Sequence, residues 1–402
     1  MNKNILSLYQ IAQKPSRKII GLMSGTSMDG LDVAFCEISG AGETTEVKLL
    51  HFDTVNYSEE VRIEIRKVFA KQTIDFQHLA LLNEWIGILH ANMIIECLQH
   101  WNIPSSEIDL IASHGQTVMH APKILHQQEK FPNATLQIGD GDHIAVKTGI
   151  ITLSDFRQKH LAAGGEGAPL AVYGDYFIFR KEGENRIMLN MGGIANFTYL
   201  PITMNPEDVF VTDVGTGNTL IDAFMRLYFL DKNYDKDAEI AKGGTVNQSL
   251  LKALKSNDFF QKPFPKTTGP ELFNVEYVRK SQVESCTQKI TVNDLLATLT
   301  RFSAETIAEA VDFVIKNTLY PCENFNIYMS GGGMHNPLLV SWLKELLPCN
   351  FLKINDLGIS GDAKEAVLFA ILANETVAGG DSDFSSCRGI PSVSMGKISF
   401  PS

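Results

Sequence analysis

Three glycine-rich turns, each directly after a short apolar run, are the parts of this sequence best suited to chemistry. The first is GLMSGTSMDGLD, which ends at Asp32. Gly25 and Gly30 have no Cβ, so backbone N–H groups of such a turn can approach phosphate oxygens closely. The hydroxyls of Ser24 and Thr26 add further donors. A plain hairpin turn is the alternative that fits the same residues.

The second turn, DVGTGN, places an acidic residue beside two glycines. Asp213 ends an apolar run, and Gly215 and Gly217 open a stretch with helical periodicity. Glycines at the start of a helix expose N–H groups that bind anions. A neighbouring carboxylate can accept a proton from an attacking hydroxyl or water. An ordinary strand-to-helix turn with an N-cap would use the same residues.

The third turn, MSGGGMHN, contains Gly331, Gly332 and Gly333 between a predicted strand and a predicted helix. Three glycines there fit the close approach of a backbone to a nucleotide, although a tight turn would also use them. If the three turns face a shared cleft, together they indicate a nucleotide site more specifically than any one of them alone.

Other polar residues are suited to bind sugar hydroxyls and a carboxylate. SHGQT follows a buried apolar run, and SDFRQKHLAAGGEGAPL contains a glycine-rich stretch that looks mobile. KTTGPE and the pair Asp362 and Glu365 are weaker candidates, because their spacing favours a surface loop and a helix N-cap. A lone histidine after a strand is also often structural. The sugar-side candidates are His114, Gln116, Asp155, Arg157, Glu166 and Glu365.

The order of the predicted elements repeats along the chain. Strands Ile19–Met23 and Leu31–Ile38 form a predicted hairpin, and a long helix is predicted over Phe76–Trp101. A second series starts at strand Arg186–Met191 and reaches a long helix over Val292–Lys316. With 402 residues, the chain exceeds what one hydrophobic core usually organises. Two α/β halves, each with a mixed sheet, are therefore predicted.

Composition restricts the class of partner and the location. The formal net charge of −11 argues against a nucleic-acid partner, which needs a basic face, but it allows a local phosphate site. We expect no signal peptide and no membrane span. The six cysteines contain no CxxC pair, which predicts reduced thiols in a cytoplasmic protein. The expected partner is a small-molecule sugar, with a possible homodimer.

At these motifs the sequence resembles the anhydro-N-acetylmuramic acid kinase family of the actin/hexokinase/Hsp70 superfamily. The similar strings keep the family's order from about residue 19 to residue 375, and GLMSGTSMDGLD and AAGGEGAPL are the most specific. The resemblance implies a two-domain α/β fold of the actin/hexokinase/Hsp70 type with an interdomain active-site cleft. One ribonuclease-H-like domain would cover residues 16–154 and 376–402, and the other residues 155–375.

The resemblance also implies an activity. Such a kinase opens the 1,6-anhydro ring of anhydro-N-acetylmuramic acid and transfers the γ-phosphate of ATP to O6, giving N-acetylmuramic acid 6-phosphate in peptidoglycan recycling. Asp213 would be the catalytic base for the water that attacks C1. Mg²⁺ is expected, because phosphate charge must be neutralised. The ATP-binding residues would be Gly25, Thr26, Ser27, Met28, Asp29, Gly30, Leu31, Asp32, Gly215, Gly217, Asn218, Gly331, Gly332 and Gly333.

The sequence departs from the family's usual residues on the sugar side. His160 stands where Asp is common, Glu166 where Gln is common, and Ala171-Val172 where Val-Pro is common. Glu166 adds a negative charge beside a substrate that itself carries a lactyl carboxylate. A kinase for another sugar, or a glycoside hydrolase on the same fold, therefore stays open. A nucleotide-dependent chaperone-like module is the other alternative, and the sugar-side motifs argue against it.

Overall fold

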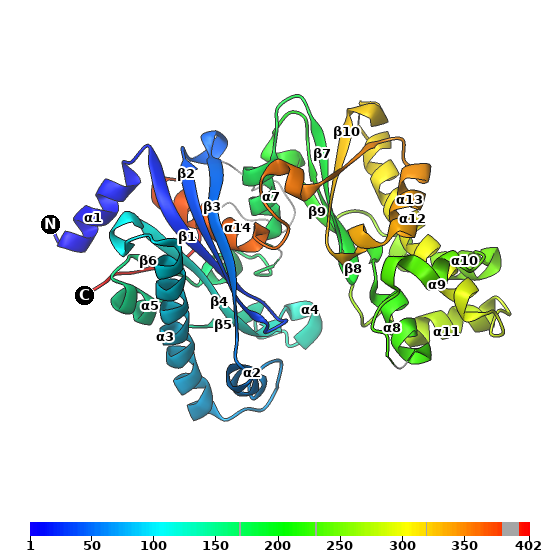
Figure 1. Ribbon diagram of the computed structural model, residues 1–402, viewed down its shortest axis with the longest axis horizontal. Coiled ribbons are helices and arrows are strands. Elements are labelled where there is room, and N and C mark those ends of the chain that lie inside the picture. The colour runs from blue at the N-terminus through cyan, green and yellow to red at the C-terminus, as the bar shows by residue number, and fades with distance from the viewer. Residues whose placement is uncertain (169, 230, 319, 380–393) are drawn as a thin grey trace. The chain divides into compact units, whose positions relative to one another are not determined.

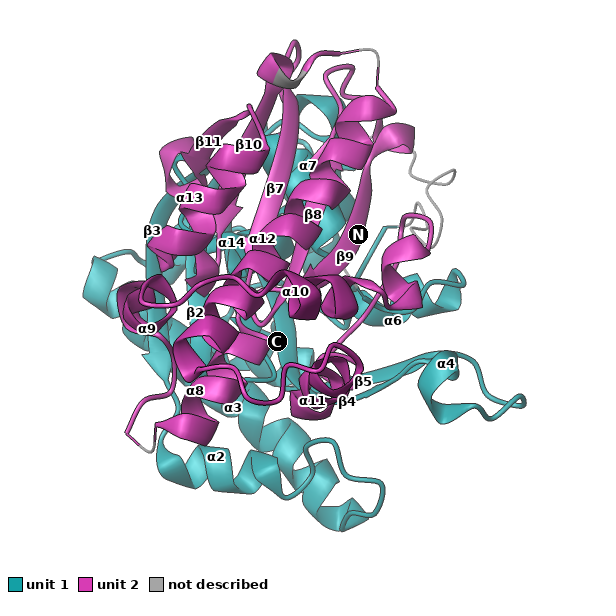
Figure 2. Ribbon diagram, turned by 90° about the vertical axis from the view of Figure 1, so that its right-hand side faces the viewer, with its two compact units in different colours: residues 1–179, 358–402 teal, residues 180–357 magenta. Residues whose placement is uncertain are grey.

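The computed structural model describes residues 1–168, 170–229, 231–318, 320–379 and 394–402 (Figure 1). These residues form two compact units (Figure 2). Unit 1 comprises Met1–Phe179 and Gly358–Ser402, and unit 2 comprises Arg180–Leu357. The prediction of two α/β halves is confirmed. The division falls at other residues than those expected, because residues 155–179 and 358–375 belong to unit 1.

Unit 1 is built on one mixed sheet. Its strands are β1 (Ser16–Ser24), β2 (Gly30–Ser39), β3 (Glu46–Asn56), β4 (Leu110–Ala121), β5 (Ala134–Ile138), β6 (Thr152–Ser154) and β12 (Lys397–Ser399). They are ordered β12-β6-β4-β1-β2-β3, and β5 pairs with β4. β1, β2 and β3 form an antiparallel series, whereas β4 runs parallel to β1. The first glycine-rich turn therefore connects two central strands.

Helices complete unit 1. They are α1 (Lys3–Ala12), α2 (Glu59–Arg66), α3 (Phe76–Trp101), α4 (Lys123–His126), α5 (Gly141–Thr148), α6 (Phe156–Ala162), α7 (Ala171–Phe179) and α14 (Lys364–Ala378). Residues of α3 share a hydrophobic core with β1 and β2. α14 lies so close to β1 that a Cβ on Gly21 would be 1.9 Å from the carbonyl oxygen of Ala366. This close packing explains why α14 belongs to unit 1.

Unit 2 has a smaller mixed sheet. Its strands are β7 (Asn185–Met191), β8 (Ile194–Leu200), β9 (Phe210–Thr216), β10 (Phe325–Ser330) and β11 (Asn350–Lys353), ordered β11-β10-β7-β8-β9. Its α-helices are α8 (Thr219–Tyr228), α9 (Glu239–Lys242), α10 (Gln248–Lys255), α11 (Val275–Glu284), α12 (Val292–Lys316) and α13 (Pro337–Leu346). The buried face of α12 packs against the sheet around Phe197 and Ile327. An aromatic cluster including Phe273 and Phe302 fills a second core.

The two sheets repeat one topology. In each, the first three strands are antiparallel in sequence order, and the fourth lies beside the first and parallel to it. The turn after the first strand is therefore adjacent to the end of the fourth. In unit 1 this pairs Ser24 with Gln116, and in unit 2 it pairs Asn190 with Ser330. The repeated strand order confirms the repetition expected from the sequence, and it positions the candidate site residues.

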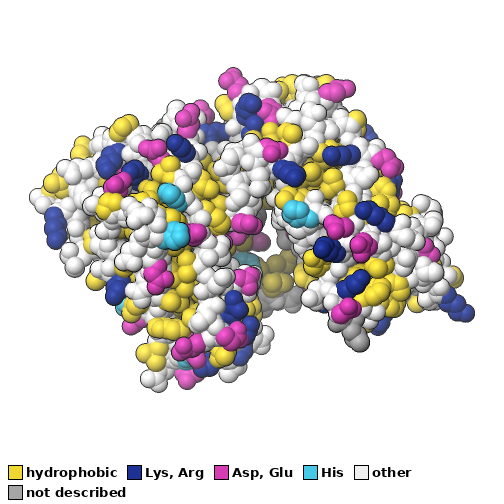
Figure 3. Space-filling model, viewed as in Figure 1, with side chains coloured by type: hydrophobic (Ala, Val, Ile, Leu, Met, Phe, Trp, Pro, Cys, Tyr) yellow, Lys and Arg dark blue, Asp and Glu magenta, His cyan; other side chains and the backbone are white. Residues whose placement is uncertain are grey.

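Three further observations bear on the sequence-based expectations. None of the helices in the described parts of the chain is long and apolar enough to cross a membrane. Cys36, Cys97 and Cys286 are free, whereas Cys349 is disulfide-bonded, so the expectation of reduced thiols is wrong for Cys349. On the face drawn in Figure 3, Lys and Arg side chains are interspersed with Asp and Glu.

Candidate active site

The turn between β1 and β2 has its carbonyl groups anchored in the protein. The Gly25 carbonyl accepts a hydrogen bond from Nε2 of Gln116 at 2.9 Å, and the Asp29 carbonyl accepts one from the backbone N–H of Tyr57 at 2.9 Å. In a trans peptide the N–H points opposite to the C=O, so the N–H of Thr26 points away from Gln116. Thr26 is exposed. The turn can therefore present an N–H group to an anion.

The two glycines of this turn have different roles. A Cβ on Gly30 would lie 2.3 Å from the backbone oxygen of Val55, so Gly30 permits the close pairing of β2 with β3. A Cβ on Gly25 would have only the Met23 side chain nearby, at 3.6 Å. The fold therefore requires Gly30, whereas the absence of a side chain at Gly25 leaves open space for a ligand.

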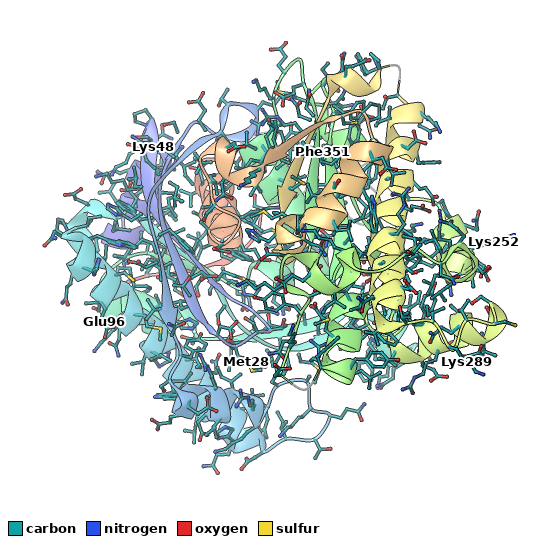
Figure 4. The ribbon with its side chains drawn as sticks, turned by 45° about the vertical axis from the view of Figure 1, so that its right-hand side comes forward. Met28, Lys48, Glu96, Lys252, Lys289 and Phe351 are labelled. Carbon is teal, nitrogen blue, oxygen red and sulfur yellow. The ribbon has the colours of Figure 1, made fainter. Side chains whose placement is uncertain are left out.

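The other residues expected to bind ATP in unit 1 differ in how exposed they are. Ser27 and Asp29 are exposed, and Met28, labelled in Figure 4, lies in the turn with a φ of 57°. Leu31 is fully buried in the core, so only its backbone could contribute to a site. The Asp32 carboxylate accepts a hydrogen bond from the Thr54 hydroxyl at 2.6 Å.

Gln116 lies beneath the turn, where it cannot serve as the expected sugar ligand. It has no exposed surface. Its amide oxygen accepts a hydrogen bond from the Ser24 hydroxyl at 2.6 Å. Its amide nitrogen donates to the carbonyls of Gly25 and Thr117. Because both ends of the amide are used within the protein, the structure corrects the expectation for Gln116.

His114 is also buried, and it orients Arg157. Nε of Arg157 donates to Nε2 of His114 at 2.8 Å, so the ring proton must lie on Nδ1, which donates to the Gly115 carbonyl at 2.8 Å. Burial first, and then the charge of Arg157, lower the pKa of His114 to about 3. The imidazole is therefore neutral at physiological pH. Its expected role as a sugar ligand is corrected to one of holding Arg157.

The stretch that looked mobile in the sequence is anchored at one residue, Gly167. The carbonyl of Gly167 accepts a hydrogen bond from Nη1 of Arg157 at 2.6 Å, and its N–H donates to Nδ1 of His160 at 3.0 Å. A Cβ on Gly165 would be 2.2 Å from the His160 ring. Glu166, between these glycines, is exposed. Arg157 and His160 thus hold the turn from both sides and leave the Glu166 side chain open to solvent.

The other two sugar-side candidates, Asp155 and Glu365, differ in the charged groups near their carboxylates. The Asp155 carboxylate forms an ion pair with Nζ of Lys397 at 2.6 Å. Glu365 lies in the first turn of α14 and is exposed. Desolvation by the surrounding protein raises the pKa of Glu365, and the charge of Arg157 partly opposes that rise. Arg157 and Glu365 therefore form an electrostatically coupled pair on unit 1.

Asp213 lies in the middle of β9 in unit 2, because the strand continues to Thr216 and not only to Asp213 as the sequence suggested, and it has the properties of a general base. Its Oδ2 accepts a hydrogen bond from the backbone N–H of Thr268 at 2.8 Å, and its own N–H donates to the carbonyl of Lys266. Burial raises the pKa of Asp213 to about 6, the Thr268 hydrogen bond lowers it, and Glu271 raises it further. A carboxylate with this pKa is ionised at pH 7 yet basic enough to take a proton. The KTTGPE segment, judged a surface loop from its spacing, supplies these neighbours.

The start of α8 does not offer the free N–H groups expected from DVGTGN. The N–H groups of Gly217 and Asn218 donate to the carbonyls of Gly193 and Gly192, at 2.8 and 2.9 Å. A Cβ on Gly217 would lie 2.2 Å from the Gly192 oxygen, and Gly215 is buried with a φ of 145°. These residues therefore hold a neighbouring turn, and the expected anion site at this helix is corrected.

The triple-glycine turn lies against that same region of unit 2. A Cβ on Gly331 would be 2.8 Å from the Met191 carbonyl oxygen, and one on Gly333 would be 2.6 Å from the Met191 Cβ. For Gly332 the nearest atom would be Nδ2 of Asn218, at 3.6 Å. Two of the three predicted turns thus converge at one edge of the unit 2 sheet, and Gly332 is the glycine with free space around it.

The comparisons with known proteins agree on one family. The model of the family described as anhydro-N-acetylmuramic acid kinase matches residues 17–400. The chain belongs to the anhydro-N-acetylmuramic acid kinase family. It is 54% identical to the family's kinase from Pseudoalteromonas atlantica and 52% identical to that from Pseudoalteromonas translucida, each over 100% of both chains. It is 38% identical to the one from Caldanaerobacter subterraneus subsp. tengcongensis, over 98% of this chain and 99% of the relative. The suspected resemblance is confirmed.

One turn of this family member that belongs with the candidate site was not predicted from the sequence. Gly192 and Gly193 connect β7 to β8, the position that the β1–β2 turn occupies in unit 1. Their carbonyls are bonded to the start of α8, so the N–H of Gly193 points away from Asn218. Gly193 is exposed. The signal was the glycine pair between two strands, at the equivalent step of the repeated order.

Proposed function

We propose that this chain is an ATP-dependent kinase that acts on anhydro-N-acetylmuramic acid and releases N-acetylmuramic acid 6-phosphate and ADP. The observation that carries the proposal is the state of Asp213. Its carboxylate is half-buried, one oxygen is held by Thr268, and its pKa is about 6. A carboxylate of this kind suits the activation of water beside a sugar ring.

The proposed reaction couples hydrolysis to phosphoryl transfer. Asp213 accepts a proton from water, and the water oxygen forms a bond to C1 of the sugar. The bond between C1 and O6 breaks, and its electron pair stays on O6. O6 then bonds to the γ-phosphorus as the bond between that phosphorus and the β,γ-bridging oxygen breaks, which releases ADP. Atoms and charge balance without a further reactant.

The proposed phosphate donors are backbone groups. In unit 1 they include the N–H of Thr26, which points away from the anchored carbonyl of Gly25. In unit 2 they include the N–H of Gly193, whose neighbouring carbonyl on Gly192 is bonded to Asn218. Backbone donors of this kind bind phosphate without a basic patch, as an acidic chain requires. Gly25 and Gly332 leave room for the nucleotide because no side chain fills the space beside them.

Mg²⁺ fits the proposed site as a nucleotide-bound ion. Within the described ranges, no group of three His, Cys, Asp or Glu side chains is placed to hold a metal. Mg²⁺ typically uses one or two carboxylates together with phosphate oxygens and water. Asp32 is the protein ligand that fits, because its carboxylate is held in place by the Thr54 hydroxyl and lies near the negative charges of Asp362 and Asp29, which a cation would offset. When bound, the ion neutralises charge on the β- and γ-phosphate oxygens.

Sugar binding is proposed for the side chains that remain open on unit 1. Arg157 is oriented by His114 and Gly167, which prepares its guanidinium to bind the lactyl carboxylate. Glu365 is exposed and suited to accept hydrogen bonds from sugar hydroxyls. Asp155 and Glu166 stay candidates, with Asp155 needing to exchange its bond to Lys397. A cytoplasmic location and a possible homodimer also stay predictions.

A coupled assay tests this function. Purified protein with Mg²⁺ and ATP is expected to release ADP only when anhydro-N-acetylmuramic acid is present, and the product is expected to carry one phosphate on O6. ADP release with a different sugar alone would favour another sugar kinase of this fold. Slow ATP hydrolysis that no sugar stimulates would favour a chaperone-like module. Ring opening without ADP release would indicate a hydrolase.

A further inference from the structure

Tyr57 contacts both ends of the turn between β1 and β2. It directly follows β3 and is 3% exposed. Its backbone N–H donates to the carbonyl of Asp29, the last residue before β2, at 2.9 Å. Its hydroxyl lies 2.8 Å from Oγ of Ser24, the last residue of β1. One buried residue therefore joins the two arms that carry the turn, through its backbone N–H on one arm and its side-chain hydroxyl on the other.

The hydrogen bonds beneath the turn fix the orientation of the Gln116 amide. The same amide nitrogen lies 2.9 Å from the carbonyl oxygen of Gly25 and 3.0 Å from that of Thr117. Both carbonyls only accept hydrogen bonds, so the NH₂ group must face them. The amide oxygen therefore faces Ser24, and it can only accept.

The direction of the remaining hydrogen bonds follows by counting protons. The single hydroxyl proton of Ser24 serves one of two acceptors, the Gln116 oxygen at 2.6 Å or the Gly30 carbonyl at 3.1 Å. It therefore cannot also point to Tyr57, so the Tyr57 hydroxyl donates to Ser24. The Tyr57 oxygen is then the acceptor toward Nε2 of His90, which lies 2.6 Å away. His90 must carry its proton on Nε2.

His90 is the last residue in this series of hydrogen bonds, and it lies in the core of unit 1. It has no exposed surface, and its ring is stacked on Tyr57 with an interplanar angle of 6°. Its Nδ1 is buried and has no partner among the residues that the structure describes. Burial lowers the pKa of His90 to about 3, which agrees with a neutral ring. A protonated His90 would bury a charge, so the neutral Nε2–H form is the one that this network uses.

We propose that Tyr57 and His90 are positioning residues for the nucleotide phosphates. The series from His90 through Tyr57 and Ser24 to Gln116 fixes the Gly25 carbonyl and, through the planar peptide, the direction of the Thr26 N–H. This inference rests on the proposed function, because it takes the β1–β2 turn as the phosphate-binding turn. It adds residues that touch no substrate themselves and act through the turn.

The substitution Tyr57→Phe removes the hydroxyl and keeps the stacked ring. Ser24 then accepts no hydrogen bond from residue 57, so its hydroxyl, and through it the oxygen of the Gln116 amide, is held less firmly. We expect the KM for ATP to rise about tenfold while the KM for the sugar changes less than twofold. Tyr199→Phe is the matched control, because Tyr199 donates a buried hydrogen bond to Asn185 in unit 2, at 3.0 Å. The control is expected to lower the melting temperature comparably and to leave the KM for ATP unchanged.

Gly25→Ala separates this inference from the proposed function. If Gly25→Ala weakens ATP binding but Tyr57→Phe behaves as Tyr199→Phe does, the positioning role is overturned and the phosphate-binding turn stands. If Gly25→Ala leaves ATP binding unchanged, the turn is not the phosphate site, and both that assignment and the positioning role fail, whereas the kinase activity is tested separately by sugar-dependent ADP release. If Tyr57→Phe does not fold, Ser24→Ala provides the test, because it interrupts the same series without touching the stacked rings.

Two further measurements distinguish positioning from general destabilisation. In a double-mutant cycle, the variant that carries both Ser24→Ala and Tyr57→Phe is expected to raise the KM for ATP by no more than the single variants do. The reason is that both substitutions interrupt the same series of hydrogen bonds. Fully multiplicative effects on the KM would contradict the idea that the two residues act through one series of hydrogen bonds. In ¹⁵N NMR spectra, His90 is expected to show a protonated Nε2 and an unprotonated Nδ1 at pH 7. The opposite tautomer would overturn the hydrogen-bond direction derived above.

Discussion

The backbone N–H of Thr268 donates to Oδ2 of Asp213 across 2.8 Å. This hydrogen bond fixes the carboxylate plane and occupies one oxygen, whereas Oδ1 has no hydrogen-bond partner in the described parts of the chain. The bond also opposes the rise in the Asp213 pKa that burial causes. The anchored oxygen therefore keeps the group ionised near neutral pH, and the other oxygen is left to receive a proton.

Asp213→Asn is expected to abolish turnover. An amide keeps the shape of the side chain and can still accept the Thr268 hydrogen bond, but it cannot take a proton from water. Turnover should fall by a factor of at least about 10³, within the range of a lost general base, while the Kd for ATP changes less than threefold. Single-turnover kinetics and calorimetric titration measure the two quantities. Near-normal turnover would contradict the role of Asp213.

The same variant is expected to be more stable than the original chain above pH 6. The folded state raises the pKa of Asp213 from 3.8 to about 6, so the stability tied to this group is complete below pH 4 and is lost as the pH rises through 6. Full conversion of that shift would give about 3 kcal/mol, and partial solvent access reduces it to about 1–2 kcal/mol. Urea unfolding at pH 4 and pH 8 checks the prediction. The variant's gain in the free energy of unfolding over the original chain must be smaller at pH 4 than at pH 8.

Glu271→Gln is expected to move the acidic limb of the pH profile to lower pH. Glu271 raises the pKa of Asp213 through its negative charge, so removing that charge lets Asp213 ionise at lower pH. The wild-type value of kcat/KM should rise with pH through about 6, and the midpoint in the variant should lie a few tenths of a unit lower. Glu276→Gln, in the first turn of α11, is the control with an unchanged midpoint. An upward shift in Glu271→Gln would refute the electrostatic argument.

Much of the fold could be predicted from local signals in the sequence. The bounds of α3 and α12 agree with the predicted helices, because each begins after a capping side chain, Asp75 or Thr291, and continues with regular apolar spacing. α7 was missed because nearly all of its residues are buried, which leaves no polar face to reveal the helical period. The domain division depends on α14 packing against Gly21, a contact between distant residues that local patterns do not encode.

The candidate site was predictable in its residue types but not in its side-chain directions. The glycine turns and Asp213 were identified from composition and position after strands. His114 and Gln116 have the same residue types that a sugar site would need, yet their polar atoms bind Arg157, Ser24 and the backbone. Whether a polar side chain faces the ligand or supports a ligand-binding neighbour is decided by tertiary packing, so sequence spacing alone could not separate the two.

Gly25→Ala and Gly30→Ala form a matched pair. A methyl group at Gly25 has free space, so the free energy of unfolding should change by less than about 0.5 kcal/mol, while ATP binding weakens at least tenfold because the methyl occupies the ligand's space. A methyl group at Gly30 would collide with the Val55 backbone and should cost about 1–3 kcal/mol of stability. Thermal unfolding with and without ATP measures both. Equal loss of stability in the two variants would contradict the distinction.

A second matched pair, Gly332→Ala and Gly333→Ala, tests the triple-glycine turn of unit 2. A Cβ on Gly332 would have Nδ2 of Asn218 as its nearest atom, at 3.6 Å, so Gly332→Ala should fold normally. If the nucleotide lies beside this turn, the same variant should bind ATP more weakly. Gly333 faces the Met191 Cβ at 2.6 Å, so its variant should lose about 1–3 kcal/mol of stability through overpacking. Calorimetric titration with ATP and urea unfolding separate the two effects. A Gly332→Ala variant with unchanged affinity would place the nucleotide away from this turn, because a methyl group that meets no protein atom can weaken binding only by meeting the ligand.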